Sequence, residues 1–394
     1  MNIILTQYLY PIEQPILLSE KLGLYFDNPR HEHEIEIIKK YIKVSLDSPN
    51  KMYEYNPALR LPISAPRHIL SIKQAFSKFK TINKNDKYKG QFILENKKKH
   101  IFEVLAKMWV VLRYNDYGEF NSLKKAREDD GGNWVVFLGE DNPIVASEKS
   151  ANSFAHLLSL LISPKEDYFG QCLLLHEGHY DLAEPKIDRW LNKAILSWAF
   201  FCYQTNKDKI DENQWLFDFS LVKAQAIEVA KSIDEILDEK SKEKLLYVGS
   251  MLRLCGVEIR DPKMKLVTLV SIIELMLTHA PDFKRFNVED SISKQFKLKL
   301  GVLLYQEDCG INFLELNKRL GEIYSQRSNV AHGNFAEYEK IIKKEVDKIK
   351  EKDDWDDWKG IARENFVSDC YTYIKVIMKA YLKDRNFVDF LKDS

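Results

Sequence analysis

Long helix-compatible runs with few interruptions constrain the fold of this chain more than any other sequence feature. The 394 residues include 15 Gly and 12 Pro, roughly 7% of the chain against about 12% in average usage. Apolar residues recur at three- and four-residue spacing, as at Ile101, Val104, Leu105, Met108 and Leu112, and this spacing predicts the buried stripe of an amphipathic helix. The sequence therefore predicts a mostly α-helical protein.

Helical patterns dominate from residue 64 onward. They predict helices over Pro66–Lys80, Lys98–Tyr114, Ser150–Ile162, Lys186–Tyr203, Trp215–Leu237 and Lys242–Leu254. Apolar runs between turn residues predict one strand at Gly131–Gly139, with a second candidate at Gln171–Gly178. Before residue 64, prolines and β-branched residues predict short strands or irregular structure around one helix.

A domain boundary is expected near residue 261. Asp261 and Pro262 form an N-cap followed by the residue best tolerated at the first helical position, so a new helix should begin there. This boundary divides the chain into a helix-rich region 1–260 with a few short strands, and a helical domain 261–394. Region 1–260 has further candidate boundaries near residues 64 and 150.

Charge and cysteine content exclude several classes of protein. Lys plus Arg and Asp plus Glu each number 59, for a formal net charge of 0, so any binding to nucleic acid or membrane must be local. The five cysteines are odd in number and widely spaced, which fits neither a disulfide framework nor paired zinc ligands. They are Cys172, Cys202, Cys255, Cys309 and Cys370. Free thiols in a reducing cytoplasm are expected.

No membrane span or secretion signal is predicted. The longest strongly apolar segment, Leu266–Leu277, contains a Glu and falls short of the ~18 residues that a span requires. The N-terminus lacks a basic stretch before its apolar residues.

The segment Ile323–Lys340, IYSQRSNVAHGNFAEYEK, carries the most chemistry. Gly333 is a natural residue to end the helix that starts near Asn312, because glycine adopts a left-handed conformation without penalty. Asn334, followed by Glu337, resembles the capping box that starts a helix. A junction between two helices is therefore expected at residues 332–334.

Arg327 and His332 flank this junction and form a plausible pair for cleaving a phosphodiester. An imidazole can move the proton of a ribose 2′-OH or of a leaving oxygen, and a guanidinium can bind phosphate oxygens. Residues five apart lie about 140° apart around a helix. The two side chains can therefore meet only if the last turn of the helix unwinds or if the Arg327 side chain extends around the helix. Ser328 and Asn329 could bind phosphate or orient the imidazole, although such residues also cap helix ends.

The form RSNVAHG resembles the signature of HEPN domains, and IYSQRSNVAHG is most similar to the Apea-like HEPN group. The upstream run SIIELML, with Glu274 inside an apolar stripe, is similar to the acidic position of an early helix in those domains. The resemblance covers only the C-terminal third, where it implies four or five helices between residues 263 and 383.

The resemblance implies a metal-independent endoribonuclease that acts as a homodimer, with two copies of the motif facing one cleft. In this reading His332 is the general acid or base, Arg327 stabilises the phosphoryl charge, and no cofactor or metal is needed. The resemblance also implies a role in phage defence, abortive infection or a toxin system. Region 1–260 would then have a sensor or regulatory role toward a phage-derived trigger or an inhibitory partner.

Two supporting residues have structural alternatives. A carboxylate at Glu274 is too costly to bury alone, so it should face solvent or meet a cation such as Arg327. Tyr324, one turn before Arg327, is expected to pack, with its hydroxyl at the rim of the cleft.

Other interpretations stay open at this point. His332 could only cap its helix while Arg327 pairs with Glu274, in a non-catalytic HEPN-like module that dimerises and binds RNA, a nucleotide or a protein. His176 and His179 are three residues apart and could bind metal on a helix, but the apolar run before them favours a strand, where that spacing has no meaning.

Overall fold

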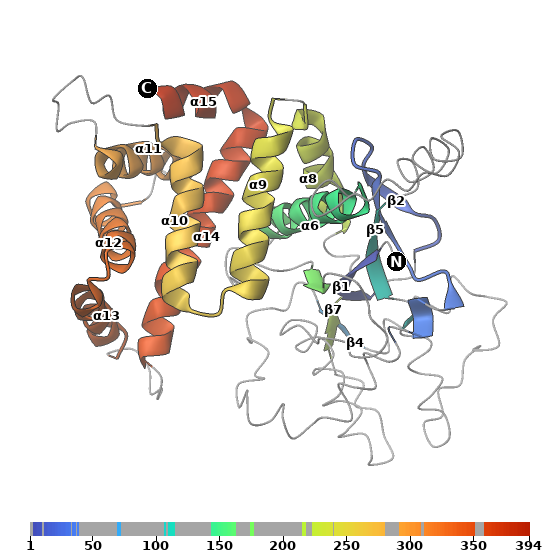
Figure 1. Ribbon diagram of the computed structural model, residues 1–394, viewed down its shortest axis with the longest axis horizontal. Helices are drawn as coiled ribbons and strands as arrows, with labels where there is room; N and C mark the ends of the chain where they lie inside the picture. Colours follow the sequence, from blue (N-terminus) through green and yellow to red (C-terminus); the bar gives the residue numbers. More distant parts are fainter. Residues whose placement is uncertain are drawn as a thin grey trace, which may run out of the picture. The chain divides into compact units, whose positions relative to one another are not determined.

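The chain is mostly α-helical in the parts that the computed structural model describes (Figure 1). The described residues are 3–9, 12–32, 34–36, 38, 69–71, 106–107, 109–114, 143–162, 174–176, 215–217, 223–238, 240–279, 291–308, 311–350 and 358–394. Among the helices within these ranges, none combines the length and apolarity needed to cross a membrane.

The chain divides into two compact units. The first contains residues 1–162 and 172–246, and the second contains residues 163–171 and 247–394. The strands belong to the first unit, whereas the helices from residue 262 onward belong to the second. The boundary expected near residue 261 stays a prediction.

The first unit contains a five-stranded sheet in the order β2-β3-β5-β1-β6, in which every neighbouring pair is antiparallel. Its strands are β1 (Ile3–Leu9), β2 (Ile16–Ser19), β3 (Leu24–Asp27), β5 (Trp109–Tyr114) and β6 (Leu174–His176). A second ladder joins β4 (Ile69–Ser71) to β7 (Trp215–Phe217). Strand β6 confirms part of the candidate strand at residues 171–178.

Two helices of the first unit pack against the sheet, α6 (Pro143–Ile162) and α8 (Lys223–Ile236). Every residue from 151 to 162 is buried, as expected of a helix that is largely apolar on all sides. Helix α6 confirms the helix predicted over 150–162, and α9 (Lys242–Arg253) confirms the one over 242–254.

The helix predicted over Lys98–Tyr114 is wrong in its last part, because Trp109–Tyr114 is strand β5. The side chains of residues 109–112 are all buried, so the strand shows no alternation between polar and apolar residues. A short run that is apolar throughout cannot be assigned to helix or strand by its spacing. Pairing with β1 and β3 on its two sides makes it a strand.

Two other helix predictions are each wrong over three residues, again because pairing with another segment makes those residues a strand. Residues 69–71 within Pro66–Lys80 and residues 215–217 within Trp215–Leu237 pair with each other as β4 and β7. These segments lie far apart in the sequence, so their pairing leaves no local pattern. The predictions for Gly131–Gly139 and Lys186–Tyr203 fall outside the described residues.

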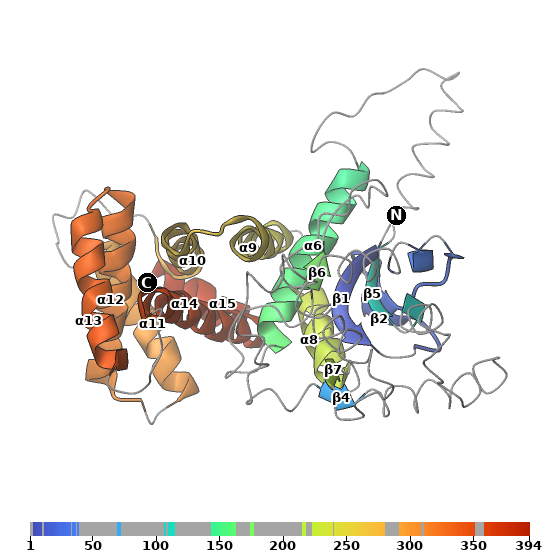
Figure 2. The same ribbon diagram turned by 90° about the horizontal axis from the view of Figure 1, so that it is seen from below.

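The second unit is built of helices (Figure 2). Its elements are a π-helical segment at Leu254–Glu258, α10 (Pro262–Leu277), α11 (Ile292–Glu307), α12 (Phe313–Ala331), α13 (Phe335–Lys350), α14 (Trp358–Lys383) and α15 (Arg385–Asp393). Helix α14 packs against α10, α11, α13 and α15, and α12 packs against α10, α11 and α13. Side chains at helical spacing along α14 form its buried stripe, and these include Phe366, Cys370, Ile374 and Ile377.

Candidate functional site

Helix α12 ends with a Schellman motif at the expected junction. The backbone N–H of Gly333 donates to the Val330 carbonyl at 3.1 Å, and the N–H of Asn334 donates to the Asn329 carbonyl at 2.7 Å. Gly333 has a φ of 73°, a left-handed conformation that favours glycine. The prediction that Gly333 ends this helix is therefore confirmed.

His332 is the C-cap of α12 and is exposed to solvent. Its backbone N–H donates to the Ser328 carbonyl at 3.0 Å, so the α-helical bonding continues to the cap and the last turn does not unwind. By helix geometry, the positions of Arg327 and His332 then lie about 140° apart around the axis. The backbone of a single chain therefore does not turn these two side chains toward each other.

Arg327 forms the expected ion pair with Glu274. The Arg327 Nη2 atom lies 2.9 Å from the Glu274 Oε2 atom, with side chains 27% and 15% exposed respectively. This contact joins α12 to α10 and offsets the cost of placing a carboxylate within the apolar face of α10. The Arg327 Nε atom is buried and has no hydrogen-bond partner within the described part of the chain.

Tyr324 lies beside the same carboxylate. Its ring packs at 5.3 Å and a tilt of 51° against Phe296 of α11, which confirms its expected packing role. Burial raises the pKa of Tyr324, and the negative charge and hydrogen bond of Glu274 raise this pKa further, against the opposing charge of Arg327. Tyr324 therefore stays protonated at neutral pH and can donate to Glu274.

Ser328 and Asn329 are partly exposed and use their backbone carbonyls in the helix end. The Ser328 carbonyl accepts from His332 and the Asn329 carbonyl accepts from Asn334. The structure thus gathers Glu274, Arg327 and Tyr324 into one cluster and places Ser328, Asn329 and His332 along the end of α12.

A polar cluster at the start of α13 was missed by the sequence analysis. Glu339 accepts from the Arg363 Nη2 atom at 2.8 Å, and its Oε1 atom lies 3.9 Å from the Lys263 Nζ atom. The same Nζ atom lies 5.5 Å from the centre of the Phe335 ring and 5.4 Å from that of Tyr338. Proximity of Phe335 to the junction was the only sequence signal for this cluster.

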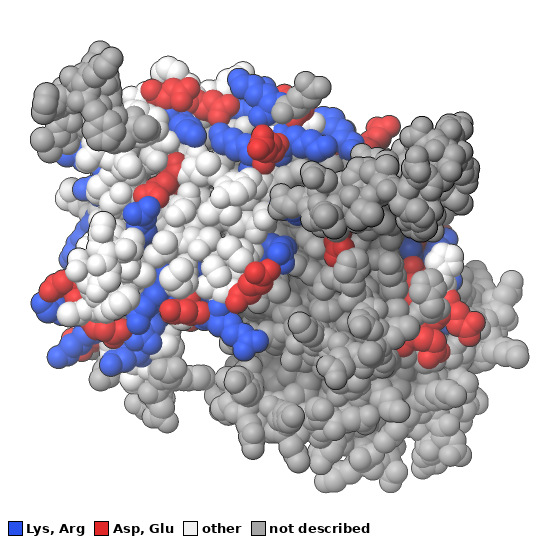
Figure 3. Space-filling model, viewed as in Figure 1, with Lys and Arg blue, Asp and Glu red and all other residues white. Residues whose placement is uncertain are grey.

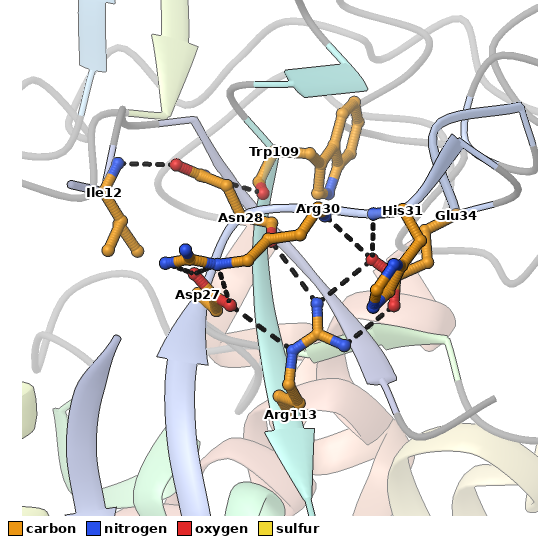
Figure 4. Close-up of polar contacts among 8 residues, drawn as sticks. All are labelled: Ile12, Asp27, Asn28, Arg30, His31, Glu34, Trp109 and Arg113. Atoms are coloured by element: carbon orange, nitrogen blue, oxygen red, sulfur yellow. Dashed lines mark hydrogen bonds and ion pairs between the residues drawn. The ribbon is translucent and has the colours of Figure 1, made fainter. Parts of the chain in front are cut away.

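A second missed cluster lies in the first unit (Figure 4). Arg113 of β5 contacts two carboxylates, with Nη1 2.7 Å from Glu34 Oε1 and Nε 3.4 Å from Asp27 Oδ2. Arg30 also binds Asp27, at 2.7 Å. The available sequence signal was the cation Arg113 near the end of the apolar run Trp109–Tyr114. That run was assigned to a helix, so the signal was not used.

The possible metal pair His176 and His179 is only partly described. Residue 176 ends strand β6, in agreement with the strand favoured for this run, and residue 179 falls outside the described residues. No group of three or more His, Cys, Asp or Glu side chains is arranged to hold a metal ion within the ranges described.

Comparison of the chain with models of known protein families, with curated proteins and with solved structures finds no match in any of the three.

Proposed function

We propose that this protein is a metal-independent endoribonuclease of the HEPN type, with its active site at the C-terminal end of α12. The observation that supports this proposal best is the exposed His332 at a glycine-terminated helix end, on the same helix as Arg327, which is paired with Glu274. The sequence resemblance of RSNVAHG supports the same proposal.

The proposed reaction is attack of a ribose 2′-oxygen on the adjacent phosphorus. His332 removes the 2′-OH proton or gives a proton to the departing 5′-oxygen, and the products are a 2′,3′-cyclic phosphate and a 5′-hydroxyl. Arg327 binds the non-bridging oxygens, where negative charge builds in the transition state. Ser328 and Asn329 position the scissile group. DNA lacks the 2′-OH and is not a substrate in this mechanism.

A homodimer would complete this site. Because Arg327 and His332 of one chain lie about 140° apart around α12, one chain presents the two groups in different directions. A two-fold axis beside α12 would let Arg327 of one copy and His332 of the other face the same phosphate. The ion pair with Glu274 would hold each guanidinium in position before RNA binds.

The biological setting is proposed from the resemblance and from composition. We infer a cytoplasmic enzyme of phage defence, abortive infection or a toxin system, whose first 260 residues respond to a trigger or an inhibitory partner. The two cysteines within the described ranges, Cys255 and Cys370, are both free and buried, which suits a reducing compartment.

Cleavage of RNA by full-length variants in the presence of EDTA tests the function. His332→Ala and Arg327→Ala should each lower the rate by about 10²–10⁴-fold, and the double variant should be little slower than the slower single one. Arg253→Ala removes a comparable ion pair, to Glu258 at 2.7 Å in the same unit, and should cut at the wild-type rate. The wild-type product should end in a 2′,3′-cyclic phosphate.

Three results would contradict the mechanism. They are wild-type rates in folded His332→Ala protein, products that end in a 3′-hydroxyl, and activity that EDTA abolishes and divalent metal restores. A wild-type protein that dimerises and binds RNA without cutting it would instead support the non-catalytic module.

A further inference from the structure

Phe335 is an exposed aromatic residue beside the proposed active site. It is the first residue of α13 and the third after His332, and its side chain is 52% exposed. All seven residues from 331 to 337 are exposed, and Phe335 is the one large apolar side chain among them. Burial in the core therefore does not explain a phenylalanine at this position.

One cation, Lys263, lies close to this ring, and it shares a carboxylate with a second cation, Arg363. Lys263 lies over the Phe335 ring and also approaches Glu339, which Arg363 binds at 2.8 Å. The longer 3.9 Å contact leaves Lys263 only weakly paired with Glu339. Asp261 supplies a further negative charge to this region, although its carboxylate accepts from the Lys263 backbone N–H as the cap of α10.

The Arg363 side chain is partly exposed, at 27%, although its Nε atom is buried. A phosphate near Lys263 and Arg363 would meet two cations that share the Glu339 carboxylate, with Asp261 as a further negative charge nearby. Figure 3 shows that basic and acidic side chains are interspersed over the α13 end of this unit. The positive charge of Lys263 and Arg363 is therefore not part of an extended basic patch on this face.

This combination fits a nucleic acid better than a protein partner. Large contiguous apolar patches mark protein–protein interfaces, whereas residues 331–337 offer one ring among polar or small side chains. Single-stranded nucleic acids are bound by aromatic rings that stack on bases, together with cations that contact the backbone. Phe335, Lys263 and Arg363 supply both components.

We propose that Phe335, Lys263 and Arg363 form a subsite for one unpaired nucleotide next to the scissile phosphate. The base stacks on the Phe335 ring and its phosphate binds Lys263 and Arg363. The three-residue separation from His332 limits the distance between the two Cα atoms to about 11 Å, so one RNA strand can contact both. This inference rests on the proposed function, and it specifies single-stranded RNA as the substrate at this site.

Binding of a fluorescently labelled single-stranded RNA tests the subsite. The measurement uses anisotropy with full-length protein that carries His332→Ala, so that the RNA is not cut. Phe335→Ala should weaken binding by about 5- to 150-fold, the loss expected when one base loses its stacking partner. Phe335→Trp should keep the affinity. Phe390→Ala removes a more exposed ring, 71% exposed on α15, and should change nothing.

Salt dependence tests the phosphate contacts. Lys263→Ala and Arg363→Gln should each weaken binding, and each should lower the slope of log affinity against log salt by about one. Arg253→Ala should leave that slope unchanged.

The subsite is overturned if Phe335→Ala binds RNA as tightly as Phe390→Ala does. It is also overturned if Phe335→Ala alters self-association in sedimentation but leaves RNA binding unchanged, since the ring would then belong to a protein interface. Failure of the subsite and failure of the nuclease can be told apart. Cleavage at the wild-type rate by Phe335→Ala rejects only the subsite, whereas Phe335-dependent binding without cleavage by the wild type rejects only the nuclease.

Discussion

Glu274 connects stability and chemistry at the scale of single residues. Its carboxylate lies on a helix with an apolar buried face and contacts both Arg327 and Tyr324. Such a group is costly to bury without partners, and the two contacts come from the helix that carries the proposed active site. Removal of this carboxylate should therefore affect both folding and catalysis.

We expect Glu274→Gln to lower the free energy of unfolding by about 1–3 kcal/mol, because the guanidinium and the phenol lose a charged acceptor. Tyr324→Phe keeps the ring packing and should cost about 0.5–1.5 kcal/mol. Urea unfolding of the full chain measures both. A double-variant cycle of Glu274→Gln with Arg327→Ala should show coupling, and strictly additive effects would contradict the ion pair.

At the scale of elements, Gly333 determines where α12 stops and α13 begins. Its left-handed φ of 73° permits the two backbone bonds of the Schellman motif. A Cβ atom added at Gly333 would meet no atom within 4 Å, so the cost of a substitution comes from backbone conformation alone. His332, which immediately precedes Gly333, depends on this turn for its position.

Gly333→Ala should therefore destabilise the protein by about 1–2 kcal/mol, and Gly333→Asn should cost less because Asn tolerates this conformation. Gly321→Ala is the matched control, since a Cβ there would meet only Lys297 Cδ, at an ordinary 3.8 Å. In the interior of α12 that change should stabilise by about 0.5–1 kcal/mol. The midpoint temperature of thermal unfolding distinguishes Gly333→Ala from Gly321→Ala. Equal shifts of that temperature in the two variants would refute the role of the φ angle at Gly333.

At the scale of the whole molecule, each of the two units has its own partly buried ion pair, Arg113 with Glu34 in the first unit and Arg327 with Glu274 in the second. In the first unit, Arg113 of strand β5 joins the carboxylates of Glu34 and of Asp27, the last residue of β3 (Figure 4). Burial by itself raises the pKa of Glu34, but hydrogen bonds from Arg113, Arg30 and His31 outweigh burial and leave the pKa below the ordinary value of 4.5.

A lowered pKa means that Glu34 stabilises the folded unit above about pH 4.5 and that this contribution disappears as the pH falls through the folded-state pKa. Glu34→Gln should lower stability at pH 7 and flatten its dependence on pH in the acidic range. Hydrogen exchange of the peptides covering β3 and β5 measures this effect, with α14 as the reference. Glu235→Gln alters a carboxylate that is 65% exposed and should leave the acid profile unchanged.

The sequence by itself determined features that depend on neighbouring residues. Asp261 and Asn312 accept hydrogen bonds from the backbone N–H groups of the helices that follow them, and Gly333 ends α12 as its residue type predicts. These interactions span only a few residues, so the chemistry that specifies them is visible in the sequence. The mostly helical class was predictable for the same reason, since the apolar spacing of α10 and α12 to α14 is local.

Tertiary structure decided features that join distant segments. Trp109–Tyr114 is a strand because β1 and β3 pair with its two edges, and its own apolar run was compatible with either structure. The sequence allowed Glu274 either to face solvent or to meet a cation such as Arg327, and packing of α10 against α12 decided in favour of Arg327. Likewise, Lys263, Phe335 and Arg363 come from three helices. Their meeting depends on the packing of those helices, which no local sequence pattern encodes.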